Sequence, residues 1–388
     1  MIDSRSRWDR TVVSAAFVAE GCCFADMNGD GVDELVAGEQ WWSLDDPAAA
    51  STVFRTVEDA WLPPWGGGPD RTDPHTHLRE GGGPPQYKAA TYDWPLPGRD
   101  GPALLSVGMH RDPLRWFEHR DAPGLWRGHE ITRGGIYESV VYTALDPRGT
   151  RGLVTVPDRP KISWFEPRPD PYEPWIEHPV GDYGGNWHGL GVGAIDADTQ
   201  PHILTPTCSY VPDGDIRRRW RRTALMQIDE RSTISAGLGD VGMIHTHRFG
   251  TGPASLFAAS PHGRGLWRWD LAEANHRCRI YQRRTLESTT SQLHALAVIP
   301  ATAQEPVDAW VITGKRWHAH GPGFDLDPGG TPLLFRVGIH ADPTVPAQTE
   351  VIDDSSGVGM QFAVRRLPDQ RMQIATANKL GVHLFTEK

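Results

Sequence analysis

Short hydrophobic runs of about five residues recur along the chain, and each follows a turn sequence rich in Asp, Gly or Pro. Runs of this length, bounded by turns, are typical of β-strands that are buried on both faces. They repeat about every 50 residues in the middle of the chain, which indicates a repeat architecture. The seven runs are 34–38, 103–107, 152–156, 202–206, 255–259, 309–313 and 372–376.

Each run is followed by a second pattern, an aromatic strand, and then in two repeats by a further strand. The sequence Trp-Phe-Glu occurs at 116–118 and 164–166, and the later strands read Trp126-x-x-His129-x-Ile131 and Trp175-x-x-His178-x-Val180. In the fourth repeat the aromatic strand is weaker, and we assign it to 225–228. Four strands in each of seven repeats predict an all-β fold, a seven-bladed β-propeller with four-stranded blades.

The two ends of the chain fit this fold. The chain stops after a strand of the third kind, 381–385, and it begins with 8–14, which resembles the missing fourth strand. We therefore expect the N-terminal strand to complete the last blade and close the ring, which removes an exposed sheet edge. We expect one domain, 1–388, with blades at about 16–61, 84–133, 137–182, 187–236, 241–288, 291–354 and 358–388 plus 8–14.

Composition agrees with many tight turns and excludes several classes of protein. The 388 residues include 42 Gly and 33 Pro, and the formal net charge is −10, so no nucleic-acid partner is expected. The chain has no long apolar run, so we expect no membrane span, and its start lacks the apolar region of a signal peptide. With only 4 Cys and no disulfide framework, a cytoplasmic location is expected.

The first turn carries an acidic loop with the spacing of a calcium site. Asp26, Asn28, Asp30 and Glu34 occupy positions one, three, five and nine, and Gly31 permits the sharp turn between them. We expect structural Ca²⁺ here, pinning the first blade. The alternative is a turn of the same sequence that is held by its own hydrogen bonds.

This loop and the strand after it, Leu-Val-Ala-Gly, resemble the FG-GAP/VCBS repeat, and the Trp-Phe-Glu and Trp-x-x-His patterns resemble propellers of that group. Within the group, the chain is similar to the aldos-2-ulose dehydratase/isomerase propellers. The resemblance implies a propeller fold and either a lyase or isomerase activity or, as in many other members, a binding or adhesion role.

Three segments exceed the basic repeat, and we expect all three to lie on one face of the propeller. They are 62–84, 208–222, which contains the run Arg217–Arg222, and 316–331. Long loops on a rigid scaffold commonly bind ligands. Insertions also accumulate wherever a scaffold tolerates them.

Candidate catalytic residues begin the innermost strands, where they would surround the mouth of the central channel. They are His188, His245, His247, His294 and Glu138. Imidazoles together with a carboxylate suit Zn²⁺, or Mg²⁺ where oxygen ligands dominate, with an open position for substrate. Alternatively, these histidines cap strands through hydrogen bonds, as we expect for His129 and His178.

The combined pattern favours a metal-assisted lyase or isomerase that dehydrates, rearranges or cyclises a small sugar derivative or secondary-metabolite intermediate. A histidine or Glu138 would remove a proton, and Tyr87 or a second histidine would protonate the leaving group. The expected substrate-binding residues are His110, Arg159, Lys315, Gln361 and Trp187. The alternative function is a non-catalytic propeller that binds a protein or glycan through its insertion loops.

Overall fold

The computed structural model describes most of the chain, which falls into two compact units. Unit 1 comprises Met1–Gly134, Thr313–Arg336 and Glu350–Lys388, and unit 2 comprises Gly135–Ile312 and Val337–Thr349. The described residues are 2–3, 5–47, 49–55, 90–97, 101–108, 114–119, 124–132, 139–145, 149, 151–158, 160–184, 188–197, 200–316, 326–327 and 330–388.

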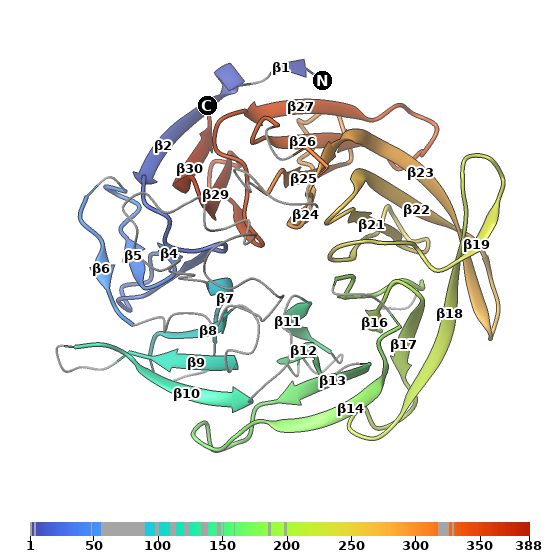
Figure 1. Ribbon diagram of the computed structural model, residues 1–388, viewed down its shortest axis with the longest axis horizontal. Coiled ribbons are helices and arrows are strands. Elements are labelled where there is room, and N and C mark those ends of the chain that lie inside the picture. The colour runs from blue at the N-terminus through green and yellow to red at the C-terminus, as the bar shows by residue number, and fades with distance from the viewer. Residues whose placement is uncertain are drawn as a thin grey trace, which may run out of the picture. The chain divides into compact units, whose positions relative to one another are not determined.

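Unit 1 contains three four-stranded sheets, whose strands lie in chain order except where the N-terminus joins the last sheet (Figure 1). The first is β3 (Cys23–Ala25), β4 (Glu34–Ala37), β5 (Gln40–Trp42) and β6 (Thr52–Val53). The second is β7 (Ala90–Pro95), β8 (Ala103–Gly108), β9 (Leu114–Glu118) and β10 (Arg127–Thr132). The third is β28 (Phe362–Arg366), β29 (Met372–Asn378), β30 (Gly381–Glu387) and β2 (Trp8–Ser14).

Unit 2 contains one four-stranded sheet and one sheet of nine strands. The four-stranded sheet is β11 (Val140–Ala144), β12 (Arg151–Asp158), β13 (Lys161–Glu166) and β14 (Ile176–Asp182). The larger sheet begins with β15 (Gly191–Gly193), β16 (His202–Leu204), β17 (Cys208–Pro212), β18 (Trp220–Ile228) and β19 (Ile234–Ala236). It continues with β20 (His245–His247), β21 (Ser255–Ala259), β22 (Arg264–Ala274) and β23 (Cys278–Ser291).

The boundary between the units crosses a five-stranded sheet. Its order is β1 (Ile2–Asp3), β27 (Gln348–Asp353), β26 (Leu334–Ile339), β25 (Ala309–Gly314) and β24 (Leu296–Pro300). The short 3-10 helix η1 (Arg5–Arg7) is the one helical element among the described residues.

The all-β class is confirmed, and the small sheets of the described chain have a propeller-like arrangement. In unit 1 the first strands β28, β3 and β7 contact one another, and in unit 2 β11, β15, β20 and β24 do the same. All seven hydrophobic runs form second strands, namely β4, β8, β12, β16, β21, β25 and β29. Strands β4, β21 and β29 are buried at every position, which explains why most of their residues are apolar or small.

The predicted number of separate blades is wrong. The structure has five blade-sized sheets of four or five strands rather than seven, together with the nine-stranded sheet. The cause is a parallel pairing between β18 and β23, which joins Ala224–Ile228 to Cys278–Gln282. The length of β23 makes this pairing possible, and no local pattern in the sequence indicates it.

The predicted insertion at 208–222 is also wrong. Its first five residues form β17, whose Cys208, Ser209 and Tyr210 are buried, and its last three begin β18. The segment 225–228, predicted as the third strand, belongs to the fourth strand β18. The remaining turn, 213–219, joins the third and fourth strands, so it lies at the opposite end of the sheet from the connection between β16 and β17.

The repeated Trp-Phe-Glu and Trp-x-x-His patterns have a structural role, as predicted for their histidines. The ring of His178 stacks on Trp164 with centroids 4.5 Å apart, and its Nε2 lies 3.1 Å from Glu166 Oε2. In the second sheet His129 stacks on Trp116 at 4.2 Å and contacts Glu118 at 2.9 Å. Each histidine thus ties the outer strand of its sheet to the third strand.

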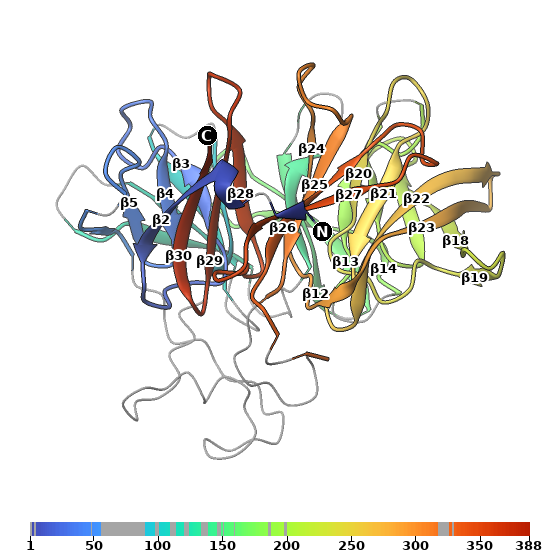
Figure 2. The same cartoon turned by 90° about the horizontal axis from the view of Figure 1, so that it is seen from above.

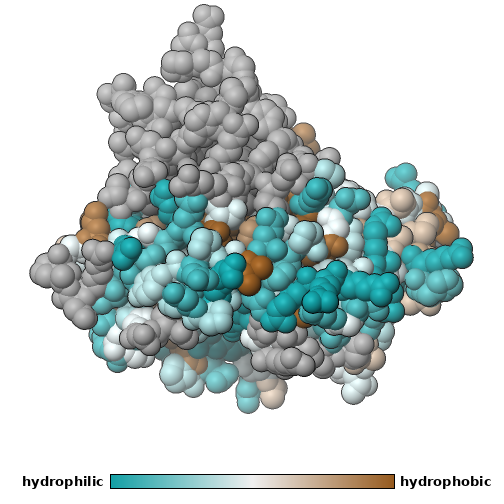
Figure 3. Space-filling view, turned by 90° about the horizontal axis from the view of Figure 1, so that it is seen from below, coloured by the Kyte–Doolittle hydropathy of each residue, from teal (hydrophilic) through white to brown (hydrophobic). Residues whose placement is uncertain are grey.

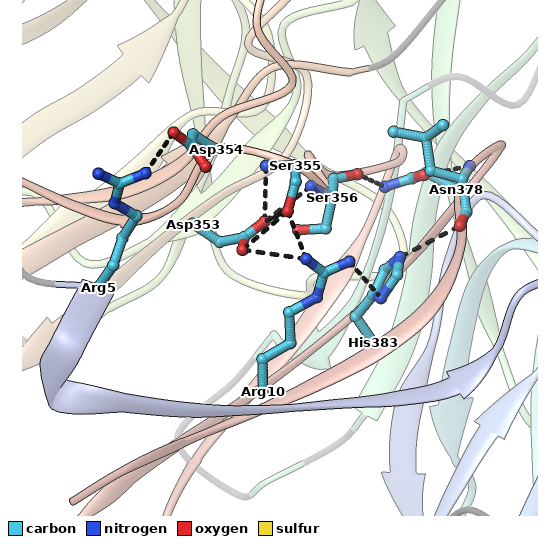
Figure 4. A network of polar contacts seen from close by, with 9 residues as sticks. Arg5, Arg10, Asp353, Asp354, Ser355, Ser356, Asn378 and His383 are labelled. Carbon is cyan, nitrogen blue, oxygen red and sulfur yellow. Dashed lines mark hydrogen bonds and ion pairs between the residues drawn. The ribbon is translucent and has the colours of Figure 1, made fainter.

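The N-terminal strand completes the last sheet, as the sequence predicted. Strand β2 pairs antiparallel with β30 from Trp8 to Ser14, and the two strands lie side by side in both views (Figures 1 and 2). Figure 4 shows that Arg10 reaches from β2 to His383 of β30 and to the loop after β27. Its Nη1 lies 3.3 Å from Asp353, and its Nη2 lies 3.3 Å from His383 Nδ1.

This attachment is expected to weaken in acid. Because a guanidinium can only donate, His383 Nδ1 accepts from Arg10 and the imidazole is neutral. Burial, reinforced by the charge of Arg10, lowers the pKa of His383 from 6.5 to about 4. The unfolded chain therefore binds more protons between these values, so stability is complete above pH 6.5 and falls as the pH drops towards 4.

Urea unfolding measured between pH 7 and pH 4 checks this expectation. His383→Gln should show a smaller loss of stability over this range than the unaltered protein. Part of the dependence should remain, because burial also lowers the pKa of His245 to about 4. An equal loss in both proteins would contradict the role of His383.

One side of the protein is mainly polar where the chain is described. Figure 3 shows that the described part of one face is mostly hydrophilic, with small separated hydrophobic spots. No helix in the described ranges is long and apolar enough to span a membrane.

Candidate metal centre

Three histidines from distant parts of the sequence converge in unit 2. His188 lies between β14 and β15, His262 lies in the turn between β21 and β22, and His294 lies between β23 and β24. Segments before a first strand and turns between second and third strands meet at the same end of these sheets. All three residues belong to unit 2.

The geometry of the group would allow it to hold a metal ion. The ligand atoms of the three rings all lie within 4.8 Å of one another, and His188 Nε2 is 3.0 Å from His262 Nε2. Nitrogens bound to one tetrahedral Zn²⁺ at about 2.0–2.1 Å are about 3.3 Å apart. The ring centroids of His294 lie 4.9 Å from His188 and 5.3 Å from His262. Small movements of the rings would therefore complete a three-histidine coordination sphere.

Two residues that lie close in sequence to these histidines have unusual backbone conformations. Gly189 follows His188 with φ of +100°, and a Cβ there would lie 2.4 Å from Pro206, so glycine is required. Gln292 adopts a φ of +60°, which is rare for a residue other than glycine. Its carbonyl oxygen accepts from the backbone N–H of His294 and lies 3.5 Å from the Nδ1 of the same ring. A strained backbone of this kind is concentrated at functional sites.

The set of donors selects among metal ions. Because His188 and His262 share a hydrogen bond, at least one of these rings accepts and is neutral, as a metal ligand must be. Imidazole nitrogens suit Zn²⁺ and other late transition metals, whereas Mg²⁺ and Ca²⁺ require oxygen ligands. Of the two ions expected from the sequence at this position, these three residues fit Zn²⁺ and do not fit Mg²⁺.

The predicted catalytic histidines divide into two groups. His188 and His294 join the metal group, both with little exposure (6% and 3%). His245 and His247 do not join it: they lie on one face of β20, and burial lowers the pKa of each. His262, which follows the second strand β21, completes the group and was not among the predicted site residues.

The other predicted site residues are placed differently. Gln361 belongs to unit 1, where its side-chain amide binds the backbone N–H and carbonyl of Asp93, which is a structural role. Lys315, also in unit 1, is buried and binds the carbonyl of Asp327. The residues that lie outside the described part of the chain are Glu138, Tyr87, His110, Arg159 and Trp187.

Unit 1 holds a second buried group of charges, centred on Glu20, which is 1% exposed. Arg316 Nε donates to its Oε2 at 2.5 Å, and Lys379 Nζ lies 3.4 Å from its Oε1. Burial alone would raise the pKa of Glu20, but Arg316 and Lys379 outweigh it and the pKa is lowered. The carboxylate is therefore ionised and ties together segments that precede β3 and follow β25 and β29.

The acidic loop of the first repeat is closed by its own hydrogen bonds. Asp26 accepts from the N–H groups of Gly29 and Gly31, and Asn28 Nδ2 donates to both Asp30 and Glu34. In the described ranges the three-histidine group is the one set of three His, Cys, Asp or Glu side chains with convergent ligand atoms. The loop thus has the arrangement of the second alternative, a hydrogen-bonded turn, and calcium binding stays a prediction.

Comparisons with known proteins assign neither a family nor an activity to the chain. No family model matches the chain, FG-GAP/VCBS included, and no curated protein matches it. Among solved structures it is similar to the GH93 alpha-L-arabinofuranosidase of Fusarium graminearum in complex with arabinobiose. The identity is 11% and the TM-score 0.43, with 76% of this chain and 92% of that chain covered. A similarity of this size carries no conclusion about activity.

Proposed function

We propose that the protein is a metal-dependent enzyme in which His188, His262 and His294 hold one Zn²⁺. The observation that carries this proposal is the convergence of their ligand atoms within 4.8 Å. Three protein ligands and one open position are typical of catalytic zinc sites, whereas structural sites are filled by four protein ligands. The open position would take an oxygen of the substrate, and the metal would supply Lewis-acid polarisation of that oxygen.

We further propose lyase or isomerase chemistry on a small sugar derivative or secondary-metabolite intermediate. Burial lowers the pKa values of His245 and His247, so both imidazoles are neutral at pH 7 but are weak proton acceptors. Glu138 and Tyr87 stay the sequence-based candidates for a base and an acid.

The alternative function, binding of a protein or glycan through insertion loops, has less support. The segment 208–222 is mainly strand, and Arg217 is held by Glu166. Arg218 and Arg219 are exposed, and each lies within 4 Å of an aspartate. The metal centre is therefore the stronger basis for a function.

We also propose that the nine-stranded sheet represents two fused blades, β15–β18 and β20–β23, so that the repeat number is seven. The support is that each half has four strands in chain order, joined only through β18 and β23. An experimental structure with seven blades around one axis is the expected result.

Metal analysis of protein purified without added metal tests the proposed function. We expect about one equivalent of Zn²⁺ per chain, and its removal by a chelator should abolish turnover of any substrate found in a screen of hydroxy and keto sugars. If the protein contained calcium but no zinc, the result would support only the Ca²⁺ site predicted in the acidic loop of the first repeat. Protein that neither retains nor takes up Zn²⁺ would overturn the proposal.

A further inference from the structure

Hydrogen bonds fix the backbone segments that carry the three histidines. Each ring comes from a different connection, and His188 and His294 are more than 100 residues apart in sequence. Metal affinity depends on how well such segments are fixed before the ion binds, because outer contacts orient the ligands. Two buried hydroxyl groups make these contacts here.

The first hydroxyl belongs to Tyr183, which follows β14 and is 1% exposed. It donates to the backbone carbonyl oxygen of His188 and lies 3.3 Å from Ser139 Oγ. Ser139 is fixed in turn, since its carbonyl accepts from Thr155 Oγ1 at 3.0 Å. The position of His188 is thereby tied to the sheet β11–β14.

The second hydroxyl belongs to Ser260, which ends β21 and is 3% exposed. Its Oγ accepts from the N–H of Gly263 at 2.7 Å and closes the turn that carries His262. Its N–H donates to the carbonyl of Gly265 at 2.9 Å, and its carbonyl accepts from the N–H of Leu293 at 3.0 Å. One residue therefore fixes both the His262 turn and the residue before His294.

We infer that Tyr183 and Ser260 are positioning residues of the metal centre, which set the three imidazoles for Zn²⁺ before it binds. The inference rests on the proposed function, because it concerns the same site. Neither side chain is a ligand: the Tyr183 hydroxyl acts through the backbone of His188, and the Ser260 hydroxyl acts through the turn that carries His262.

Tyr183→Phe and Ser260→Ala test the inference, because each removes one hydroxyl and leaves all three ligands in place. We expect each to weaken Zn²⁺ binding by about 10- to 100-fold, the usual effect of losing an outer contact. The matched controls are Tyr281→Phe, which removes a buried hydroxyl without a partner among the described residues, and Ser255→Ala, whose hydroxyl binds Asp270. Both controls should bind Zn²⁺ as the unaltered protein does.

The affinity is measured by competition with a chromophoric chelator, and the visible spectrum of the Co²⁺-substituted protein reports ligand geometry. A merely structural role would lower the urea midpoint of the metal-free protein and leave this spectrum unchanged. Unaltered protein without Zn²⁺ binding would overturn the proposed function itself. The other outcome is that the unaltered protein binds Zn²⁺ and that both variants bind it equally tightly and give the same Co²⁺ spectrum. That result would overturn only the positioning role.

Discussion

His262→Ala is expected to weaken Zn²⁺ binding by more than the roughly 100-fold that marks the loss of an outer contact. The reason is that this ring supplies one of three ligand nitrogens, and its Nε2 lies only 3.0 Å from that of His188. With two ligands left, the ion would need additional water or protein donors to hold it. Turnover that depends on the metal should fall in parallel at limiting Zn²⁺.

The measurement is a Zn²⁺ titration of chelator-treated protein, with metal analysis after dialysis. His276→Ala is the matched control, because this histidine is exposed in the turn between β22 and β23 and does not belong to the metal group. It should bind Zn²⁺ normally. Equal affinity in His262→Ala and in the control would remove His262 from the coordination sphere.

Asp93→Asn is expected to lower the free energy of unfolding by about 3–5 kcal/mol, the usual effect of removing one partner of a buried ion pair. Asp93 and Arg55 are 0% and 1% exposed, and Arg55 Nη2 lies 3.0 Å from both carboxylate oxygens. Burial raises the pKa of Asp93 despite the neighbouring Arg55, which indicates how strongly this environment opposes charge. The substitution leaves the guanidinium buried without a counter-charge.

Urea unfolding at pH 7, followed by tryptophan fluorescence, measures this effect. The matched control is Asp354→Asn, which breaks the exposed pair with Arg5 at 2.6 Å and should cost less than about 1 kcal/mol. Arg55→Met combined with Asp93→Asn should recover part of the loss, because no isolated charge then stays buried. A loss no larger than that of the control would contradict the prediction.

Local sequence patterns predicted the strands well. The buried second strands were predictable because burial on both faces favours a mainly hydrophobic run, as in β21. The pairing of β2 with β30 was predictable because the last repeat lacks an outer strand and an unpaired edge is unfavourable. The strand β17 was missed because its aromatic signal is weaker than the arginine run that follows it.

The candidate site was predictable only in part. The sequence placed His188 and His294 at equivalent ends of first strands, and this position follows from the repeat. It also placed His245 and His247 there, whereas His262 replaces them in the group. Which histidines converge depends on the turn that Ser260 closes and on the backbone conformation at Gly189 and Gln292.

By itself the sequence determined the all-β class, the repeat, the positions of its buried strands and the role of the N-terminal strand. All of these depend on the pattern of buried and exposed side chains along a strand, and this pattern can be identified within a short stretch of sequence. Only the tertiary structure decided that β18 pairs with β23 and that His262 completes the histidine group. Those outcomes depend on which distant segments meet, and the local sequence patterns of β18 and of the turn around His262 do not specify these partners.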